Sequence, residues 1–176
     1  NPVPMSRLLQ GDVGSGKTII AIASLLLVIE KNLQGAFMVP TEVLAEQHYK
    51  NLLKYLNPLL VSVELLTGNT PQKKRKEIFS NLNNGLVDIL VGTHALFEDK
   101  VIFNALGMVV IDEQHRFGVT QRNRLLNKGE NTNLLSMTAT PIPRTLALSI
   151  YGDLDVSQIT ELPPGRVPIT TKIISE

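Results

Sequence analysis

The sequence contains no cysteine, so it can form neither a disulfide framework nor a metal site built from thiolates. Its net charge is only +1, from 17 Lys and Arg against 16 Asp and Glu, which excludes a global basic field for nucleic acid. Any contact with DNA must therefore come from local clusters. With 43% hydrophobic and 19% charged residues, the 176-residue chain is expected to be one folded domain rather than a disordered segment.

A hydrophobic run long enough for a membrane span is also lacking. The most apolar stretch, Ile19 to Ile29, is interrupted by Ser24 and is shorter than the roughly 20 residues that a helix needs to cross a bilayer. No signal peptide is recognisable at the start of the sequence. We therefore expect a soluble, cytoplasmic protein with no membrane partner.

The clearest positive signal is a phosphate-binding loop of the pattern G-x-x-x-x-G-K-[ST]. The loop consists of Gly11, Asp12, Val13, Gly14, Ser15, Gly16, Lys17 and Thr18. Its glycines let backbone N–H groups turn toward phosphate oxygens, Lys17 adds charge for the β- and γ-phosphates, and the Thr18 hydroxyl can ligate Mg²⁺. A short apolar strand before the loop and a long apolar helix after it favour this interpretation over a glycine-rich turn without ligand.

A second signal is the pair Asp112 and Glu113, which follows the apolar residues 108–111. In company with a phosphate-binding loop, Asp112 is expected to hold Mg²⁺, and Glu113 to orient and deprotonate an attacking water. The alternative is a strand that happens to end in an acidic turn. A third signal is the run of hydroxyls at 136–140, which could hydrogen-bond the acidic pair; alone, this run would be an ordinary turn before a proline.

Predicted strands and helices alternate along the chain. The strands are 7–10, 36–39, 61–66, 87–91, 108–111 and 134–137, and the helices are 17–33, 41–57, 70–85, 119–126 and 143–150. Most of the strands are continuous apolar runs, which is typical of a parallel sheet with helices on both faces. The fold class is therefore α/β, and ligands should bind beyond the carboxyl ends of the strands.

Several helix ends are predicted from single residues. Gly35 is expected to stop the first helix, and Thr41 to cap a second helix whose apolar spacing includes Val43, Leu44, Gln47, Leu52 and Leu56. The hydroxyl of Thr70, followed by a proline, is expected to cap the third helix. Residues 73–76, of sequence Lys-Lys-Arg-Lys, are interpreted as a solvated helix face. Past Asp155 the pattern loosens into a linker at 162–165 and a strand at 168–174.

The motifs together resemble those of a known family. Residues 11–18, 112–115 and 138–141 are similar to motifs I, II and III of superfamily 2 helicases. Residues 112–119 and 138–146 are similar to the bacterial group that contains the RecG helicases and the transcription-repair coupling factors. Gln114, where the coupling factors usually have Glu, and residues 151–157 and 162–166 favour the RecG branch.

This resemblance implies an ATP- and Mg²⁺-dependent DNA helicase that remodels branched DNA, such as stalled forks and Holliday junctions. It implies that 1–160 is the first of two RecA-like motor domains and that 161–176 is the linker and first strand toward the second. The second motor domain, with its arginine finger, and the N-terminal wedge domain are both expected to be missing from this sequence. We therefore expect the isolated domain to be nearly inactive.

The resemblance also implies roles for residues outside the two strongest motifs. Coupling between nucleotide and movement is expected from Gln114, His115, Thr138 and Thr140. Sequence-independent contacts with DNA phosphates are expected from Thr41, Thr67, Gly68, Thr93 and His94. Small residues and hydroxyls at such turns suit phosphate contacts. A plain helix cap and a local hydrogen-bonding histidine are the competing interpretations of Thr41 and His94.

Three alternatives to the helicase are compatible with a phosphate-binding loop. A coupling-factor-type translocase would share the same motor. A nucleotide-binding switch module would bind without hydrolysis, but it would not need Glu113. A small-molecule kinase would need an acceptor site and an arginine-rich lid, and the sequence suggests neither. Catalytic roles are thus assigned to Lys17 and Glu113.

Overall fold

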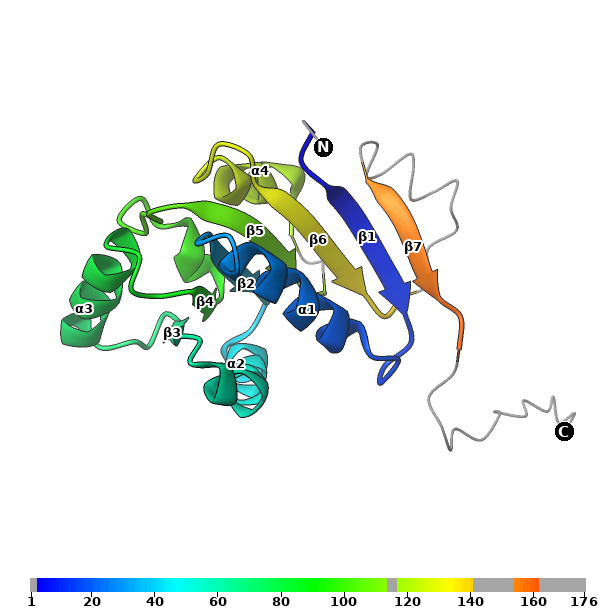
Figure 1. The fold of residues 1–176 in the computed structure, drawn as a ribbon, viewed down its shortest axis with the longest axis horizontal. Helices are drawn as coiled ribbons and strands as arrows, with labels where there is room; N and C mark the ends of the chain where they lie inside the picture. Colours follow the sequence, from blue (N-terminus) through cyan, green and yellow to red (C-terminus); the bar gives the residue numbers. More distant parts are fainter. Residues whose placement is uncertain (1–2, 114–116, 141–153, 162–176) are drawn as a thin grey trace, which may run out of the picture.

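The chain forms a seven-stranded sheet in a computed structural model that describes residues 3–113, 117–140 and 154–161 (Figure 1). The strand order is β3-β4-β2-β5-β6-β1-β7, and every neighbouring pair is parallel. The strands are β1 (Ser6–Gly11), β2 (Gln34–Met38), β3 (Val63–Leu66), β4 (Ile89–Gly92), β5 (Leu106–Ile111), β6 (Asn133–Thr138) and β7 (Asp155–Ile159). The predicted parallel α/β fold is therefore confirmed.

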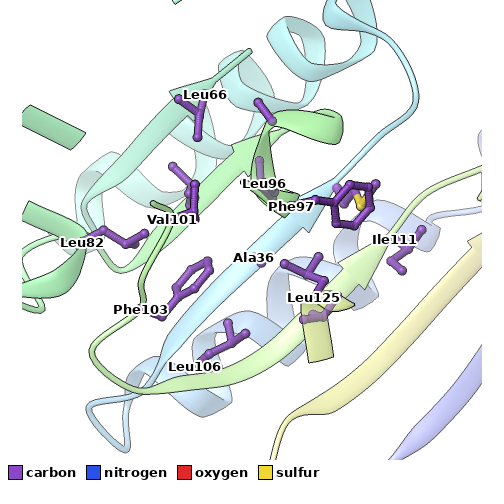
Figure 2. Close-up of a cluster of buried hydrophobic side chains, with 14 of the residues drawn as sticks. Ala36, Leu66, Leu82, Leu96, Phe97, Val101, Phe103, Leu106, Ile111 and Leu125 are labelled. Atoms are coloured by element: carbon purple, nitrogen blue, oxygen red, sulfur yellow. The ribbon is translucent and has the colours of Figure 1, made fainter. Parts of the chain in front are cut away.

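Helices cover both faces of the sheet. The α-helices are α1 (Lys17–Ile29), α2 (Glu42–Leu56), α3 (Gln72–Asn83) and α4 (Val119–Leu126), and two 3₁₀ turns are η1 (Asn57–Leu59) and η2 (His94–Phe97). One hydrophobic cluster joins the sheet to α1 and α2, and the other joins it to α3, η2 and α4. Figure 2 shows the second cluster, in which Leu82 of α3, Leu96 of η2 and Leu125 of α4 gather over the strands.

Burial on both faces explains the continuous apolar runs in the strands. In β2, Ala36 and Met38 belong to one cluster and Phe37 to the other, and all three side chains are fully buried. Side chains alternate between the faces of a strand, so a strand that is covered twice must be apolar at every position. Each large side chain buried in this way contributes about 1.5–3 kcal/mol to folding.

The first helix ends earlier than the sequence predicts. Helix α1 stops at Ile29 rather than at 33, and Asn32 takes the left-handed φ of 57° that ends the turn. Asparagine adopts this conformation more readily than other residues with a side chain. Gly35 lies inside β2 and therefore does not stop the helix. A glycine is needed at this position because a β-carbon would come 2.3 Å from Leu25 Cδ2 of α1. Its role is the close packing of helix on strand.

Two further local predictions need correction. Thr41 caps α2 as expected, but the buried face of the helix is formed by Ala45, His48, Leu52 and Leu56, and Val43 is 76% exposed. Thr70 does not cap α3, which begins after Pro71 without a side-chain cap. Its hydroxyl instead accepts a hydrogen bond from the Thr67 N–H at 2.9 Å. The predicted bounds of α4, 119–126, are confirmed.

Strand β7 is absent from the sequence prediction. It pairs in parallel with β1, which places β1 between β6 and β7 instead of at the edge of the sheet. All five residues of β7 are exposed or half-buried, so the strand lacks the apolar run that marks the others. The predicted helix at 143–150, the linker at 162–165 and the strand at 168–174 lie outside the described residues, and the division at 160 remains a proposal.

All the parallel strands end at the same edge of the sheet, and the predicted motifs follow these ends. The phosphate-binding loop follows β1, the acidic pair follows β5, and the hydroxyl run ends β6. Among the described residues, no helix is both long and apolar enough to cross a membrane.

Candidate functional site

The phosphate-binding loop connects β1 to α1 through two glycines in left-handed conformations. Gly14 and Gly16 have φ angles of 80° and 93°, which strain any residue with a β-carbon. Gly16 is the N-cap of α1 and offers no side-chain hydrogen bond. No side chain of the cap therefore occupies the N–H groups of Lys17 and Thr18, the first two of α1, and the helix dipole favours an anion at this end.

The ammonium of Lys17 lies folded over the loop. Its Nζ donates to the carbonyl oxygens of Gly11 and Asp12, at 2.7 and 2.8 Å. Burial lowers the pKa of Lys17 below its usual value, while the carboxylates of Asp112 and Glu113 act to raise it. A phosphate oxygen would compete with the two carbonyls for this charge.

The acidic pair is fixed at the end of β5 by the backbone. The Asp112 N–H donates to the carbonyl of Met38 on β2 at 2.9 Å, so Asp112 continues the sheet. Glu113 then turns with a φ of 54°, and its N–H donates to Asp112 Oδ1 at 3.0 Å. A residue with a side chain rarely adopts a positive φ, and such strain gathers at functional sites.

The loop and the acidic pair line one pocket of about 410 Å³. The pocket is lined by both residues of the acidic pair and by five residues of the predicted loop: Val13, Gly14, Gly16, Lys17 and Thr18. Gly11 and Asp12 instead line a pocket of about 470 Å³ beside β7, which shares Ala139 with the first. The Ser15 hydroxyl is buried, and a β-carbon on Gly11 would come 2.6 Å from it.

The same pocket contains oxygen donors that suit a magnesium ion. Thr18 and Asp112 both line it. Among the described residues, no group of three or more His, Cys, Asp or Glu is placed to hold a metal ion. Mg²⁺ usually binds through one or two carboxylates together with phosphates and water. The donors therefore fit a metal that binds with a nucleotide rather than one held by protein alone.

The hydroxyl run at the end of β6 forms a turn of its own. Thr138 is buried, and its Oγ1 accepts from the Thr140 N–H at 3.1 Å. The Ser136 hydroxyl is buried without a partner among the described residues, and Met137 and Ala139 line the pocket of the acidic pair. The coupling role of Thr138 and Thr140 stays a prediction. Gln114 and His115, the other two predicted coupling residues, lie outside the described residues.

The residues predicted to face DNA follow three neighbouring strands. Thr41 follows β2, Thr67 and Gly68 follow β3, and Thr93 and His94 follow β4. Thr41, Gly68 and His94 are exposed, whereas Thr67 and Thr93 are buried. The topology thus gathers all five on the β3-β4-β2 half of the edge, as phosphate contacts from one strand of DNA would require. Their contact with DNA stays a prediction.

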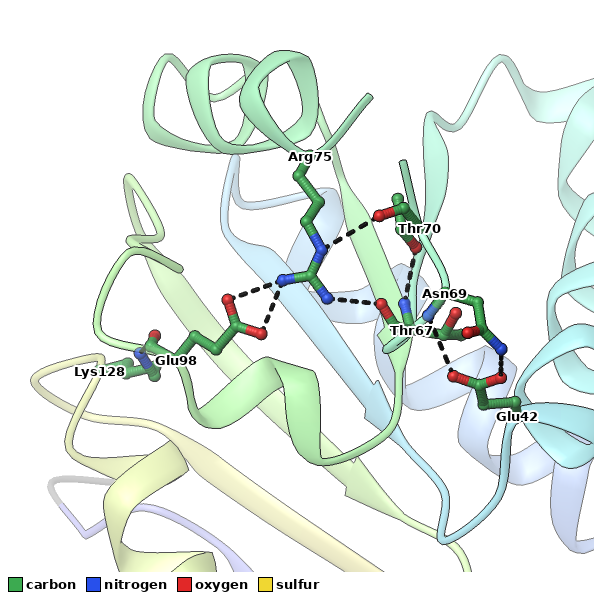
Figure 3. A network of polar contacts seen from close by, with 7 residues as sticks. All are labelled: Glu42, Thr67, Asn69, Thr70, Arg75, Glu98 and Lys128. Atoms are coloured by element: carbon green, nitrogen blue, oxygen red, sulfur yellow. Dashed lines mark hydrogen bonds and ion pairs between the residues drawn. The ribbon is translucent and has the colours of Figure 1, made fainter. Parts of the chain in front are cut away.

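A network of side chains holds these turns together (Figure 3). Arg75 of α3 donates to both carboxylate oxygens of Glu98, at 2.7 and 2.8 Å, and to the carbonyls of Thr67 and Thr70, at 2.6 and 3.2 Å. Glu42 of α2 accepts from the backbone and side-chain N–H groups of Asn69. The turn after β3 is therefore clamped by two other elements.

This network corrects the interpretation of residues 73–76. Lys73 and Lys76 are exposed as expected, but the side chain of Arg75 is only 11% exposed and Lys74 donates to Glu64 at 2.9 Å. No local pattern in the sequence distinguishes Arg75 from the neighbouring lysines, because the partners of Arg75 come from other elements.

His48 is a functional candidate that the sequence analysis missed. Its Nε2 lies 3.0 Å from Asp112 Oδ2, and its ring lies 4.7 Å from the Phe37 ring, centroid to centroid. The side chains of His48 and Asp112 are only 10% and 16% exposed. Its position on the buried face of α2, between Ala45 and Leu52, is the signal that could have singled it out.

Comparisons with known proteins agree with the motifs. Residues 4–148 match the model of the DEAD/DEAH box helicase family. The ATP-dependent DNA helicase RecG of Synechocystis is 59% identical over 99% of the chain, and that of Bacillus subtilis is 56% identical over 97%. The chain spans only 21% and 25% of the length of these two relatives.

Solved structures extend the likeness to the fold. The structure of RecG bound to a three-way DNA junction matches 94% of the chain with a TM-score of 0.80 and 49% identity, over 22% of its own length. The helicase MrfA matches with a TM-score of 0.71 at 19% identity, which speaks for the fold alone. Because the family model matches most of this chain, the chain belongs to the DEAD/DEAH box helicases.

Proposed function

We propose that this chain is the nucleotide-binding motor domain of a RecG-like DNA helicase and that it binds ATP with Mg²⁺ at the phosphate-binding loop. The observation that carries the proposal is the single pocket of about 410 Å³ lined by both the loop and the acidic pair. Phosphate recognition and hydrolysis require these groups within reach of the same phosphates. If the glycine-rich loop and the acidic pair had only structural roles, they would not need to line the same pocket.

The residues have distinct parts in this mechanism. Lys17 exchanges its two carbonyl partners for phosphate oxygens, and the N-terminus of α1 adds N–H donors. Thr18 and Asp112 would hold the metal, whose charge would offset that of the phosphates. Glu113 accepts a proton from the attacking water, and its position in the same pocket favours hydrolysis over a passive switch.

Branched DNA is the substrate we propose for the whole protein. The support is the high identity with RecG helicases and the likeness to RecG bound to a three-way DNA junction. Thr41, Thr67, Gly68, Thr93 and His94 would contact phosphates without reading sequence, and Gln114, His115, Thr138 and Thr140 would couple nucleotide to movement. Since bacterial DNA lies in the cytoplasm, a cytoplasmic location follows from this proposal.

Further domains belong to the proposal as well. The chain covers about a fifth of the RecG chain of known structure, so the rest of such a protein has room for a second motor domain and a wedge domain. The nucleotide would then lie between two motor domains. A coupling-factor-type translocase would share this motor, and the RecG relatives favour the helicase.

Calorimetric titration with a non-hydrolysable ATP analogue tests the proposal. The chain should bind the analogue with Mg²⁺, and Lys17→Ala should weaken binding by about tenfold or more, because a charge-assisted hydrogen bond contributes about 1.5–3 kcal/mol. The fold should survive, since Lys17 is half-buried and its ammonium bonds to backbone carbonyls of the loop. Lys31→Ala, at an exposed lysine beyond the end of α1, is the matched control. Equal affinity of Lys17→Ala and the control would refute the assignment of the loop.

A further inference from the structure

Helix α2 touches both halves of the functional edge. Its N-terminus follows β2, where the hydroxyl of Thr41 caps the helix and Glu42 holds Asn69 beside the predicted DNA-facing turn. Two turns later, His48 reaches Asp112 at the end of β5. A single rigid helix thus has one end at the proposed DNA surface and its middle at the proposed metal ligand.

The contact between His48 and Asp112 has a defined chemistry. A carboxylate oxygen accepts hydrogen bonds, so the Nε2 atom that lies 3.0 Å from Asp112 Oδ2 carries the hydrogen. The other ring nitrogen, Nδ1, is buried without a partner among the described residues. The Phe37 ring packs beside the imidazole and limits its rotation.

The two oxygens of Asp112 are held in different ways. Oδ1 accepts from the N–H of the next residue, Glu113, at 3.0 Å. Oδ2 accepts from His48, which is 64 positions away in the sequence. The bond to Oδ1 is local and moves with the turn, whereas the bond to Oδ2 ties the carboxylate to another element. Without His48 the carboxylate would keep its bond from the Glu113 N–H but would lose its connection to α2.

We propose that His48 is a positioning residue for the metal ligand Asp112 and that it connects the metal site to the helix that begins at the DNA-facing turn. This inference rests on the proposed binding of Mg²⁺ with a nucleotide. Residues that hydrogen-bond a metal ligand fix its orientation, and their loss typically lowers metal affinity about 10–100-fold.

The first experiment measures the apparent affinity for Mg²⁺ by titration at a fixed concentration of a fluorescent, non-hydrolysable ATP analogue. His48→Leu should weaken the apparent Mg²⁺ affinity about 10–100-fold, and affinity for the analogue in EDTA should not change. Lys50→Leu, at an exposed position of the same helix, is the control and should match the wild type. Wild-type Mg²⁺ affinity in His48→Leu would overturn the proposal.

A pair of polar variants keeps the test independent of folding. The amide of Gln reaches about as far as Nε2, and the amide of Asn ends near Nδ1. His48→Gln should therefore recover most of the Mg²⁺ affinity, whereas His48→Asn should not. A merely structural role would affect both variants alike, so equal Mg²⁺ affinity in the two would also overturn the proposal.

Histidine NMR checks the contact itself. The chain contains three histidines, so the signals of His48 can be identified by substituting the other two. The spectrum should show a hydrogen on Nε2; a ring whose only hydrogen is on Nδ1 would exclude the bond to Asp112. If the wild type binds the analogue no better with Mg²⁺ than in EDTA, the proposed function fails. A Mg²⁺ response that His48→Leu leaves intact removes only the role of His48.

Discussion

The carboxyl edge of the sheet consists of two halves that are built differently. The nucleotide half follows β1, β5 and β6, and it owes most of its shape to the backbone: Gly14, Gly16 and Glu113 all have positive φ angles. Lys17 bonds to its own loop, and the bond from His48 to Asp112 is a contact from another element. The half predicted to face DNA follows β3, β4 and β2. Its turns are held by side chains from other elements, above all by Arg75 and Glu42.

The difference shows how each half is specified. A phosphate-binding loop is formed by consecutive residues, so local substitutions are the way to destroy it. The other half depends on partners far apart in the sequence, such as Arg75 and Glu98, so its shape depends on the packing of whole helices. We expect chemistry to respond to changes in the first half, and stability together with DNA binding to respond to changes in the second.

The largest expected effect is on the rate of ATP hydrolysis, which we expect to depend on a second motor domain. The chain alone should hydrolyse ATP near background and ignore forked DNA, because the family resemblance assigns the arginine that stabilises the transferring phosphoryl group to the second motor domain. Adding the second motor domain in the same chain should raise turnover by about 10³–10⁵-fold, the effect of an arginine finger in related systems. Phosphate release with and without forked DNA measures this. Robust, DNA-stimulated turnover by the monomeric 176-residue chain would contradict it.

The next effect separates binding from chemistry within the nucleotide half. In the complete protein, Glu113→Gln should lower hydrolysis about 10²-fold or more and keep affinity for Mg·ATP, because the amide retains the shape but cannot accept the proton. Single-turnover phosphate release beside calorimetric binding separates the two. Glu46→Gln, at an exposed position of α2, is the control. Unchanged turnover in Glu113→Gln would mean that the base is another group.

The smallest expected effect belongs to the other half. Arg75→Leu should lower the free energy of unfolding by about 1–3 kcal/mol, because it removes one donor each from the carbonyls of Thr67 and Thr70 and the charged donor from the Glu98 carboxylate. The change should also weaken the salt-dependent binding of DNA, with Mg·nucleotide affinity unchanged.

Arg124→Leu is the matched control for Arg75→Leu in urea unfolding. Arg124 also donates to a carboxylate at 2.7 Å, that of Asp99, but both side chains are well exposed, and exposed pairs contribute little. If the two arginine variants unfold alike, the turn after β3 does not depend on the buried network.

Features formed by adjacent residues could be predicted from the sequence, whereas contacts between distant elements could not. The loop at 11–18 and the pair Asp112–Glu113 could be predicted because adjacent residues supply their chemistry. Helix 119–126 could be predicted because residues close in sequence determine its ends. The contact of His48 with Asp112 could not, since it depends on how α2 packs beside β5. The partners of Arg75 were hidden for the same reason.

Strand β7 escaped prediction for a different reason. Its sequence, Asp-Val-Ser-Gln-Ile, has no apolar run, because the strand is half-exposed and pairs with β1 alone among the described strands. Its place is defined by bonds such as that from Arg7 Nη1 to Ser157 Oγ, at 2.7 Å. The five residues of β7 contain no pattern from which a partner in β1 could be predicted.

The central place of β1 has a consequence for the order of folding. Ser6 pairs with Leu134, and Arg7 with Asp155, so the strand that carries the phosphate-binding loop is made long before either neighbour. Pairings so distant in sequence close late, because loop-closure entropy opposes them, and domains are synthesised from the N-terminus. On the ribosome, β2, β3, β4 and β5 can assemble first. The loop that is encoded earliest is therefore expected to acquire its native surroundings last.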